Sequence, residues 1–484
     1  MLLYLLKVKY SNNLEKKYIF YFKPIFFLGL LSLMFSCKNA MNEKTTTYFG
    51  GKIKNPKQAY VYLLKNDKII DSAAIKNKRF LFTFDSIPEG LYTFKNGSEF
   101  QYFFLEPKDS LMVYLNTWNF DETIIFSGKG AEKNNFLINI FLEQEKIENR
   151  FAQYYYLDQD KFSKKIEEEL KPLQVKYEKM VSKEDFRVSD KFQKLVSVAV
   201  YYPFYSRKEY YPLRHRNKRN RKDFPKTTKD FYDFRKNVDL NDESLISYRS
   251  YTYYIESFLY NMAYHKGLKD PENRNFPLQF MEAVSENITN PVLKNKYLVS
   301  GFWGSLKNNL SEEKLKAVQD YFFKNCKEKT YIAEAENALQ QFTRLKKGDT
   351  LPALLTTDTE GNRVDLKKII KNRNAVIYFW PSDHRKKESI LKTLHFYERK
   401  FPDVLFIGIE KDQNEQKWHN FISSKHLEKD RQFKLNHNCT SYSWFDNDAA
   451  RTLIINKNGR IQNPFLFFSD TYYLNKNLHQ LKKQ

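Results

Sequence analysis

The residues with the clearest chemical potential lie at a short corner of the chain, where a predicted strand runs directly into a helix. Residues 375–380 read Ala-Val-Ile-Tyr-Phe-Trp, an apolar run rich in β-branched and aromatic side chains that predicts a buried strand. Pro381, Ser382 and Asp383 then break the strand and offer caps for a helix. The apolar face of that helix consists of Ile390, Leu391, Leu394, Tyr397 and Phe401. A reactive group at such a corner meets the positive end of the helix dipole.

The sequence on both sides of the corner extends this pattern. Gly348-Asp349-Thr350-Leu351-Pro352 precedes it, and residues 358–366 read Asp-x-x-Gly-x-x-Val-x-Leu. Residues 404–410 predict a second buried strand, and residues 452–461 predict a late strand with a turn. This series resembles the thioredoxin-like proteins of the TlpA/ResA type over roughly the last third of the chain. The resemblance implies a thioredoxin-like α/β fold, in which the family carries a Cys-x-x-Cys at the start of the helix.

The residues that the family reaction needs are missing from this sequence. Counting from Trp380, the two cysteine positions fall on His384 and Lys387, and the chain contains no Cys-x-x-Cys. Dithiol exchange requires one thiolate that attacks and a second thiol that resolves the mixed disulfide. Ala450 occupies the position of the family's cis-proline, where a cis bond before a non-proline residue costs roughly 2.5–4 kcal/mol. We therefore expect a trans bond there, a remodelled groove and loss of the family reaction.

The remaining cysteines leave two interpretations open. Besides Cys37, the sequence has Cys326 and Cys439. An oxidising compartment would allow a disulfide between them, but their spacing follows no known pattern, and two inert thiols are the alternative. The resemblance places the loop that holds Cys439 near the active corner, which makes Cys439 a candidate for single-thiol chemistry.

No metal or cofactor site is predicted. His384 and Asp383 are adjacent, and adjacent side chains rarely converge on one ion, while His395 lies too far along the same helix to share one. The chain also lacks a phosphate-binding loop, a Gly-x-Ser-x-Gly motif, a His-Glu-x-x-His motif and paired zinc-type cysteines.

The first 37 residues have the features of an export signal. A basic flank of lysines at positions 16, 17 and 23 precedes an apolar stretch at 25–35, which is too short to span a membrane comfortably. Met34-Phe35-Ser36-Cys37 resembles a bacterial lipobox, which implies a lipidated Cys37 followed by a polar tether at 38–47; an uncleaved signal anchor is the alternative. Both interpretations predict a membrane-tethered protein of the bacterial cell envelope, on its periplasmic face. By analogy with sorting rules, Lys38 favours the outer membrane.

A strong positive charge suggests acidic surfaces as neighbours. The formal net charge is +23, and a basic cluster contributes Arg214, Arg216, Lys218, Arg219, Arg221 and Lys222. These residues are candidates for contact with anionic lipid headgroups, and a solvated loop is the alternative. Nucleic acid would also suit such a cluster, but an exported lipoprotein rarely meets it, so no nucleic-acid partner is predicted.

Hydrophobic periodicity divides the rest of the chain into three parts. Residues 48–130 show short alternating runs, such as residues 79–84, and predict a small antiparallel β-sandwich domain. They resemble the all-β domain of unknown function that precedes the thioredoxin-like domain in many such lipoproteins. Residues 131–346 change to a period of 3.6 and predict a helical domain, whose first apolar face contains Phe136, Ile140 and Phe141. With a thioredoxin-like domain at 347–484, the fold class is multidomain α+β.

The sequence as a whole favours a redox-inactive, membrane-tethered member of the TlpA-like family that binds an exported protein or peptide. The groove of the fold would be lined by Trp380, Pro381, Asp383, His384, Ala450 and Arg451. One alternative is an enzyme that uses a single thiol or thiol–disulfide exchange. A second alternative is a structural adaptor lipoprotein of the envelope, in which the thioredoxin-like part serves only as a platform.

Overall fold

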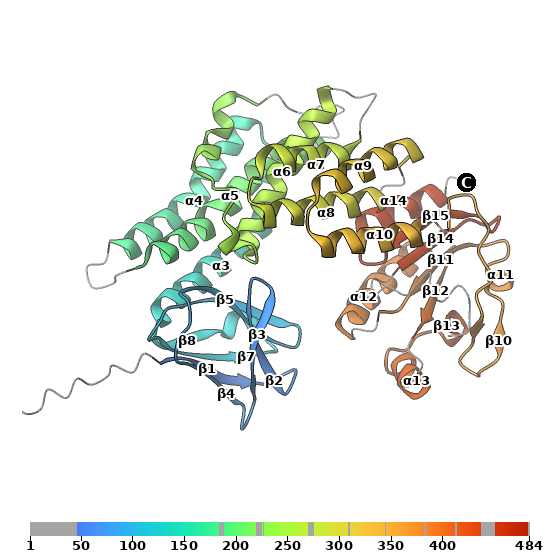
Figure 1. Cartoon of the computed structure of the whole chain (residues 1–484), viewed down its shortest axis with the longest axis horizontal. Coiled ribbons are helices and arrows are strands. Elements are labelled where there is room, and N and C mark those ends of the chain that lie inside the picture. The colour runs from blue at the N-terminus through green and yellow to red at the C-terminus, as the bar shows by residue number, and fades with distance from the viewer. Residues whose placement is uncertain are drawn as a thin grey trace, which may run out of the picture.

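The computed structural model describes residues 46–182, 188–218, 225, 227–269, 275–307, 310–343, 345–381, 384–411, 414–436 and 451–482. Within these ranges the chain forms three sheets and a large set of helices (Figure 1). None of the helices in these ranges combines the length and the apolar character needed to cross a membrane. The predicted signal at 1–37, including Cys37, lies outside the described residues.

The N-terminal part consists of two four-stranded sheets that pack face to face. Their strand orders are β4-β1-β7-β8 and β3-β2-β5-β6. β1 pairs with β4 in the antiparallel and with β7 in the parallel direction. The bounds are β1 (Thr47–Lys54), β2 (Tyr60–Lys65), β3 (Lys68–Ala74), β4 (Arg79–Phe84), β5 (Gly90–Asn96), β6 (Glu99–Leu105), β7 (Ser110–Asn116), a helical turn α2 (Phe120–Thr123) and β8 (Ile125–Lys129).

Aromatic side chains from both sheets form the core between them. Phe80 and Phe82 are buried on one face of β4, as the alternation of residues 79–84 predicts. Phe49 of β1 stacks on Phe103 of β6, with 4.0 Å between the ring centroids, so the contact joins the two sheets. Burial of such a side chain contributes about 1.5–3 kcal/mol relative to exposure.

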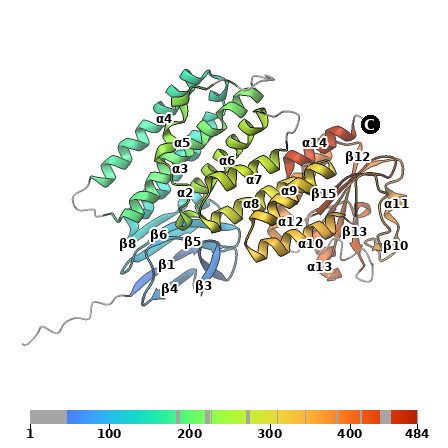
Figure 2. The ribbon, with the colours of Figure 1, turned by 45° about the horizontal axis from the view of Figure 1, so that its top comes forward.

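A long helical part follows, and it lies between the two sheet-containing parts in both views (Figures 1 and 2). The Ser311 hydroxyl accepts a bond from the Lys314 amide and caps the helix that the sequence predicted there. Phe141, expected on an apolar face, is instead 44% exposed. The bounds are α3 (Ala131–Phe151), η2 (Tyr154–Tyr156), α4 (Gln159–Val181), α5 (Asp190–Lys218), η3 (Lys229–Asn237), η4 (Glu243–Leu245), α6 (Arg249–Lys269), α7 (Phe276–Asn287), α8 (Pro291–Lys307), α9 (Glu312–Asn325) and α10 (Lys329–Thr343).

Two consecutive asparagines at the start of α3 attach this helix to both N-terminal sheets. The Asn134 amide accepts from the Phe104 N–H at 2.7 Å and donates to the Phe104 carbonyl at 2.8 Å, on β6. The Asn135 amide makes the same pair of bonds to Phe126 on β8, at 2.8 and 2.9 Å. Each side chain therefore satisfies an N–H and a C=O of a strand, which would otherwise be buried without partners.

The C-terminal part is a seven-stranded mixed sheet with the order β10-β9-β13-β12-β11-β14-β15. β11, β12 and β13 are parallel, and β14 and β15 join in the antiparallel direction. The bounds are β9 (Thr356–Thr357), β10 (Arg363–Val364), α11 (Leu366–Ile369), β11 (Asn374–Phe379), α12 (His384–Lys400), β12 (Val404–Glu410), α13 (Glu415–Ser424), η5 (Lys429–Arg431), β13 (Gln432–Leu435), β14 (Arg451–Ile455), β15 (Ile461–Phe467) and α14 (Thr471–Leu481).

The central strands of this sheet are buried on both faces. Val376 and Tyr378 of β11 face a core shared with α12, α13 and α14, whereas Ala375 and Ile377 face a core shared with residues 345–370. Both faces of a parallel strand are usually covered, so the strand is apolar throughout rather than alternating. The predicted strand at 404–410, which became β12, is buried along its whole length for the same reason.

The burial of tyrosines gives the stability of the chain a defined dependence on alkaline pH. Burial raises the pKa of Tyr92 and of Tyr205 to about 12, whereas a tyrosine in the unfolded chain titrates near 10. Their contribution to stability is complete below pH 10 and is lost as the pH rises from about 10 to about 12, because only the unfolded chain then releases the protons.

We expect the free energy of unfolding, measured by urea denaturation, to fall across this pH window. Tyr205→Phe should reduce the slope of the fall, since it removes one of the titrating groups. Parallel curves for the native chain and the variant would contradict this assignment.

Candidate functional site

The candidate site is the corner between β11 and α12, which the structure builds in the predicted order of strand, break and helix. The Trp380 N–H donates to the Ile409 carbonyl of β12 at 2.8 Å, so the strand pairing continues one residue past β11. α12 begins at His384, which confirms the prediction that a helix opens there. His384, which the sequence resemblance aligns with the family's first cysteine position, therefore lies at the N-terminus of a helix, where a thiolate would be stabilised.

The residue that the sequence resemblance aligns with the family's second cysteine position is a buried lysine, Lys387. Lys387 is 7% exposed and forms an ion pair and hydrogen bond with Glu410, which is 1% exposed, at the end of β12. The Lys387 ammonium also lies 4.9 Å from the centroid of the Phe421 ring on α13. The Lys411 N–H donates to the other Glu410 oxygen at 2.9 Å. The corner thus contains two side chains of opposite charge, Lys387 and Glu410, in an otherwise apolar setting. Neither side chain carries a thiol.

A buried hydrogen bond fixes the tryptophan beside this ion pair. The Trp380 indole N–H donates to the Gln432 side-chain oxygen of β13 at 3.0 Å, and its ring meets those of Tyr378 and Phe421 edge to face, at 5.1 Å in each case. Gly408 of β12 lies beneath this bond. A Cβ there would stand 2.3 Å from the Gln432 oxygen and 2.7 Å from the indole nitrogen, so the close approach of these groups requires glycine.

Of the predicted groove residues, those whose side chains the structure describes do not line an exposed groove. Trp380, Pro381 and Arg451 are buried, which corrects the expectation that their side chains face a partner. The physical reason is that the corner folds inward onto α13 and β13, where aromatic and amide partners cover it. Asp383 and Ala450 lie outside the described residues, as does the peptide bond that was expected to be trans.

Arg451, the first residue of β14, is a core residue of this strand. Its side chain is 0% exposed, and its Nε and Nη2 atoms both donate to the Pro464 carbonyl at 3.1 Å. Burial lowers the pKa of the guanidinium to about 10. The side chain therefore joins β14 to β15 and is not available to an external ligand.

The described cysteine does not support thiol chemistry. Cys326 is a free, buried thiol at the C-terminal cap of α9, and burial raises its pKa above the ordinary value. A raised pKa lowers the fraction of this cysteine that is present as the reactive thiolate. Cys439 lies outside the described residues. Among the described residues, no group of three or more His, Cys, Asp or Glu side chains could hold a metal ion.

Of the basic cluster of the sequence, the structure describes the side chains of Arg214 and Arg216 alone. Its first residue, Arg214, points inward on α5, where it donates to the hydroxyls of Tyr155 at 3.3 Å and Tyr253 at 3.1 Å. The Arg214 side chain is 35% exposed, and one of its terminal nitrogens also lies 3.8 Å from a carboxylate oxygen of Glu148. Arg216 is half-buried on the same helix, which ends at Lys218. Arg219, Arg221 and Lys222 lie outside the described residues.

Sequence reasoning missed Glu410 and Gln432, the two partners that complete the corner. Glu410 gave a faint signal, because a carboxylate closes an otherwise apolar strand prediction at 404–410. Gln432 gave no signal in the sequence, because it belongs to a short strand. The parallel pairing of this strand with β12, in which Gln432 lies opposite Gly408, brings it beside Trp380.

No protein-family model and no curated protein matches the chain. Among solved structures, the thioredoxin domain of a thiol-disulfide oxidoreductase from Bacteroides vulgatus shares 22% identity, covers 27% of this chain and 96% of its own, and has a TM-score of 0.23. A thiol:disulfide interchange protein from Bacteroides sp. shares 20% identity over 27% of this chain and 89% of its own (TM-score 0.23). A peroxiredoxin-like protein from Aquifex aeolicus shares 16% identity with this chain, covers 29% of this chain and 87% of its own, and has a TM-score of 0.24.

The ion pair at the corner gives a direct prediction for stability. Lys387→Met leaves the Glu410 carboxylate buried without its cation, which should cost about 3–5 kcal/mol of unfolding free energy. Replacing both residues, Lys387→Met with Glu410→Met, removes both buried charges and should recover most of that loss. Chemical denaturation of the two variants measures the difference.

Lys392→Met is the matched control, because Lys392 is exposed on the same helix. It should leave the unfolding free energy within about 0.5 kcal/mol of the native value. Equal losses in the single and double variants would show that the two charges do not compensate each other.

Proposed function

We propose that this chain is a thioredoxin-like protein without dithiol chemistry, which acts as a binding module for an exported protein or peptide. The observation that carries the proposal is the occupant of the second cysteine position. Lys387 is not a solvated replacement but half of a buried ion pair with Glu410. A restored cysteine at 387 would lie beside an uncompensated carboxylate, which would raise the pKa of a thiol and oppose thiolate formation.

The fold of the corner supports retention of a recognition role. The strand, the break and the helix N-terminus are all present, and Trp380 is held by a hydrogen bond and two ring contacts. The helix N-terminus at His384 also presents backbone N–H groups that suit acceptor groups of a peptide.

The setting of this module is proposed from the sequence of the N-terminus. The basic flank, the apolar stretch at 25–35 and the lipobox-like residues before Cys37 support export and a lipid anchor in the bacterial envelope. The polar tether at 38–47 would hold the folded part near the membrane, where the remaining basic residues of the cluster after Arg216 would meet anionic headgroups.

An insulin-reduction assay on the full-length chain tests the central proposal. We expect the native chain to be inactive, because neither family cysteine position holds a thiol. A variant with His384→Cys, Lys387→Cys and Glu410→Gln should gain activity, since it restores the dithiol and removes the carboxylate that would oppose thiolate formation. The same variant without Glu410→Gln should be both less active and less stable.

Cys439→Ser serves as the control for the enzymatic alternative. If the native chain reduces insulin and this substitution abolishes the activity, a single-thiol mechanism replaces the proposed one. If neither the native chain nor the restored variant reduces insulin, positions 384 and 387 do not correspond to the two cysteines of a dithiol site, and the proposal fails.

The anchor is tested separately by fractionating cells that express the chain. The native protein should sediment with membranes, whereas Cys37→Ser should prevent lipidation and leave the chain unprocessed. Metabolic labelling with a fatty acid should mark the native protein and not the variant. Labelling that persists in Cys37→Ser would exclude Cys37 as the lipidated residue.

A further inference from the structure

A cavity of about 410 Å³ lies in the helical part, between α3, α5 and α6, and involves none of the corner residues. Its volume falls within the range of small-molecule sites in proteins. Aromatic rings form much of its wall, including Phe141, Tyr155, Tyr210 and Tyr253. The exposed Phe141, which the sequence placed on an apolar helical face, lies on this wall.

Arginines supply the charge of the cavity, and aromatic rings hold them in place. The Arg214 guanidinium lies 4.9 Å from the Tyr155 ring centroid and 5.1 Å from that of Tyr210. Arg249 lies over the Tyr253 ring at 4.9 Å. Rings on which guanidinium groups stack keep those groups in fixed orientations, so the donors are arranged before a ligand arrives.

The hydroxyl groups beside Arg214 have protons left to donate. Arg214 can only donate hydrogen bonds, so the hydroxyls of Tyr155 and Tyr253 act as acceptors toward it, at 3.3 and 3.1 Å. Burial raises the pKa of both tyrosines above the ordinary value, so both remain protonated at neutral pH. Each hydroxyl hydrogen is thus available to an acceptor in the cavity.

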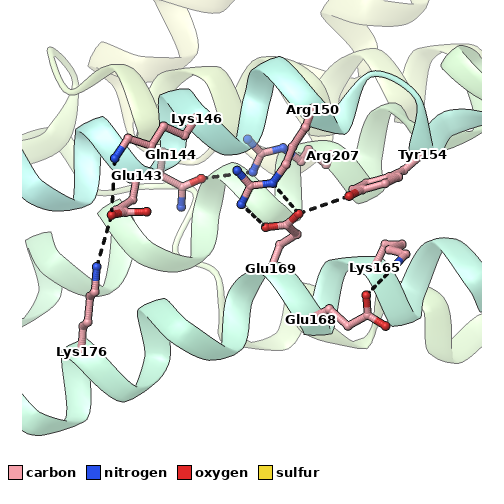
Figure 3. A network of polar contacts seen from close by, with 10 residues as sticks. All are labelled: Glu143, Gln144, Lys146, Arg150, Tyr154, Lys165, Glu168, Glu169, Lys176 and Arg207. Atoms are coloured by element: carbon pink, nitrogen blue, oxygen red, sulfur yellow. Dashed lines mark hydrogen bonds and ion pairs between the residues drawn. The ribbon is translucent and has the colours of Figure 1, made fainter.

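Two further donors on the same wall lack an acceptor. The Ser206 hydroxyl and the Arg207 Nε atom are buried and have no hydrogen-bond partner among the described residues. The Nη atoms of Arg207 donate to Gln144 at 3.2 Å and Glu148 at 2.9 Å on α3. Figure 3 shows Gln144 turned toward Arg207 between the two helices. The wall therefore has more donors than acceptors.

The acidic residues of the cavity lie at its edge. Glu148 has a side chain that is 56% exposed, and Glu145 is exposed. Arg207, in contrast, has a side chain that is 5% exposed. Glu148 nevertheless forms ion pairs with Arg207 at 2.9 Å and with Arg214 at 3.8 Å, so its carboxylate competes with a bound carboxylate for these arginines.

We propose that this cavity binds a small carboxylate with an aromatic body. The carboxylate would accept from Arg214 and from the hydroxyls of Tyr155 and Tyr253, and the aromatic group would lie against Phe141 and Tyr210. Charge-assisted bonds of this kind are stronger than neutral ones, and a carboxylate has lone pairs enough for all three donors. The carboxylate could belong to a free acid or to the C-terminus of a peptide that ends in an aromatic residue.

Isothermal titration of the full-length chain with 3-phenylpropionate tests this proposal, with 3-phenylpropanamide as the matched neutral probe. We expect the carboxylate to bind at least about tenfold more tightly than the amide, since one charged hydrogen bond contributes about that factor. Equal binding of the two probes, or binding of neither, would overturn the proposal. A tripeptide that ends in phenylalanine separates the two sources: binding assigns the site to peptide termini, and no binding assigns it to free acids.

Variants of the cavity should change affinity in opposite directions. Arg214→Gln should weaken binding of the carboxylate by about tenfold or more, and Tyr253→Phe should weaken it less, with little effect on the amide. Glu148→Gln should strengthen carboxylate binding, because it removes a neighbouring negative charge. A cavity that is only structural would show no such dependence on the sign of the charge.

Arg150→Gln is the control for charge and for folding. Arg150 lies on α3 but is not among the residues that line the cavity. It donates to Glu169 of α4 at 2.8 and 2.5 Å, a pair drawn in Figure 3. The variant removes one positive charge from the same helical part and should leave 3-phenylpropionate binding unchanged. A loss of affinity equal to that of Arg214→Gln would mean that net charge, rather than the cavity, attracts the probe, and would overturn the proposal.

Discussion

The requirement that a buried charge be compensated shapes the corner on which the C-terminal part depends. Lys387 and Glu410 come from a helix and a strand that are adjacent in space, and each is nearly inaccessible to water. Removing two ions from water is costly, and only close pairing with additional hydrogen bonds offsets that cost. The pair therefore fixes α12 against β12, and the Lys411 N–H and the Phe421 ring complete its environment.

The same constraint organises the helical part at a different place. Glu209 on α5 is buried, and Arg235 of η3 donates to both of its oxygens, at 2.8 and 2.6 Å. The Asn261 amide and the Tyr254 hydroxyl of α6 donate to it as well. One carboxylate thus joins three segments that are distant in sequence. Bidentate pairing of this type suits arginine rather than lysine, because the planar guanidinium matches the two oxygens.

The abundance of tyrosine in this chain has a structural consequence that the apolar aromatics do not share. A buried tyrosine brings a ring to the core and a hydroxyl that needs a partner. In the helical part many of these hydroxyls find carbonyls, carboxylates or arginines, as Tyr211 does with the Leu157 carbonyl at 2.9 Å. Around Arg214, the hydroxyls of Tyr155 and Tyr253 accept hydrogen bonds from the arginine and keep their own protons. These protons give the cavity its excess of hydrogen-bond donors. Structural packing and ligand recognition thus draw on the same residue type.

The sequence by itself determined the elements whose signal is local. Alternation identified β4, an unbroken apolar run identified β11 and β12, and a serine with acidic neighbours identified the start of α9. The absence of a Cys-x-x-Cys was also visible without any coordinates. These features follow from the period of side chains along a strand or a helix and from capping, which depend on residues close together in the chain.

The tertiary structure decided the environment of each functional position, because that environment comes from residues far away in sequence. Lys387 could have been a solvated lysine, and only the parallel register of β11 and β12 brings Glu410 to it. Arg451 looked like a surface charge, yet it is fully buried and donates to the Pro464 carbonyl, while two tyrosine hydroxyls bind the partly exposed Arg214. Whether a charge faces water or the core is set by the packing of distant elements, and a pattern of neighbouring residues does not contain that information.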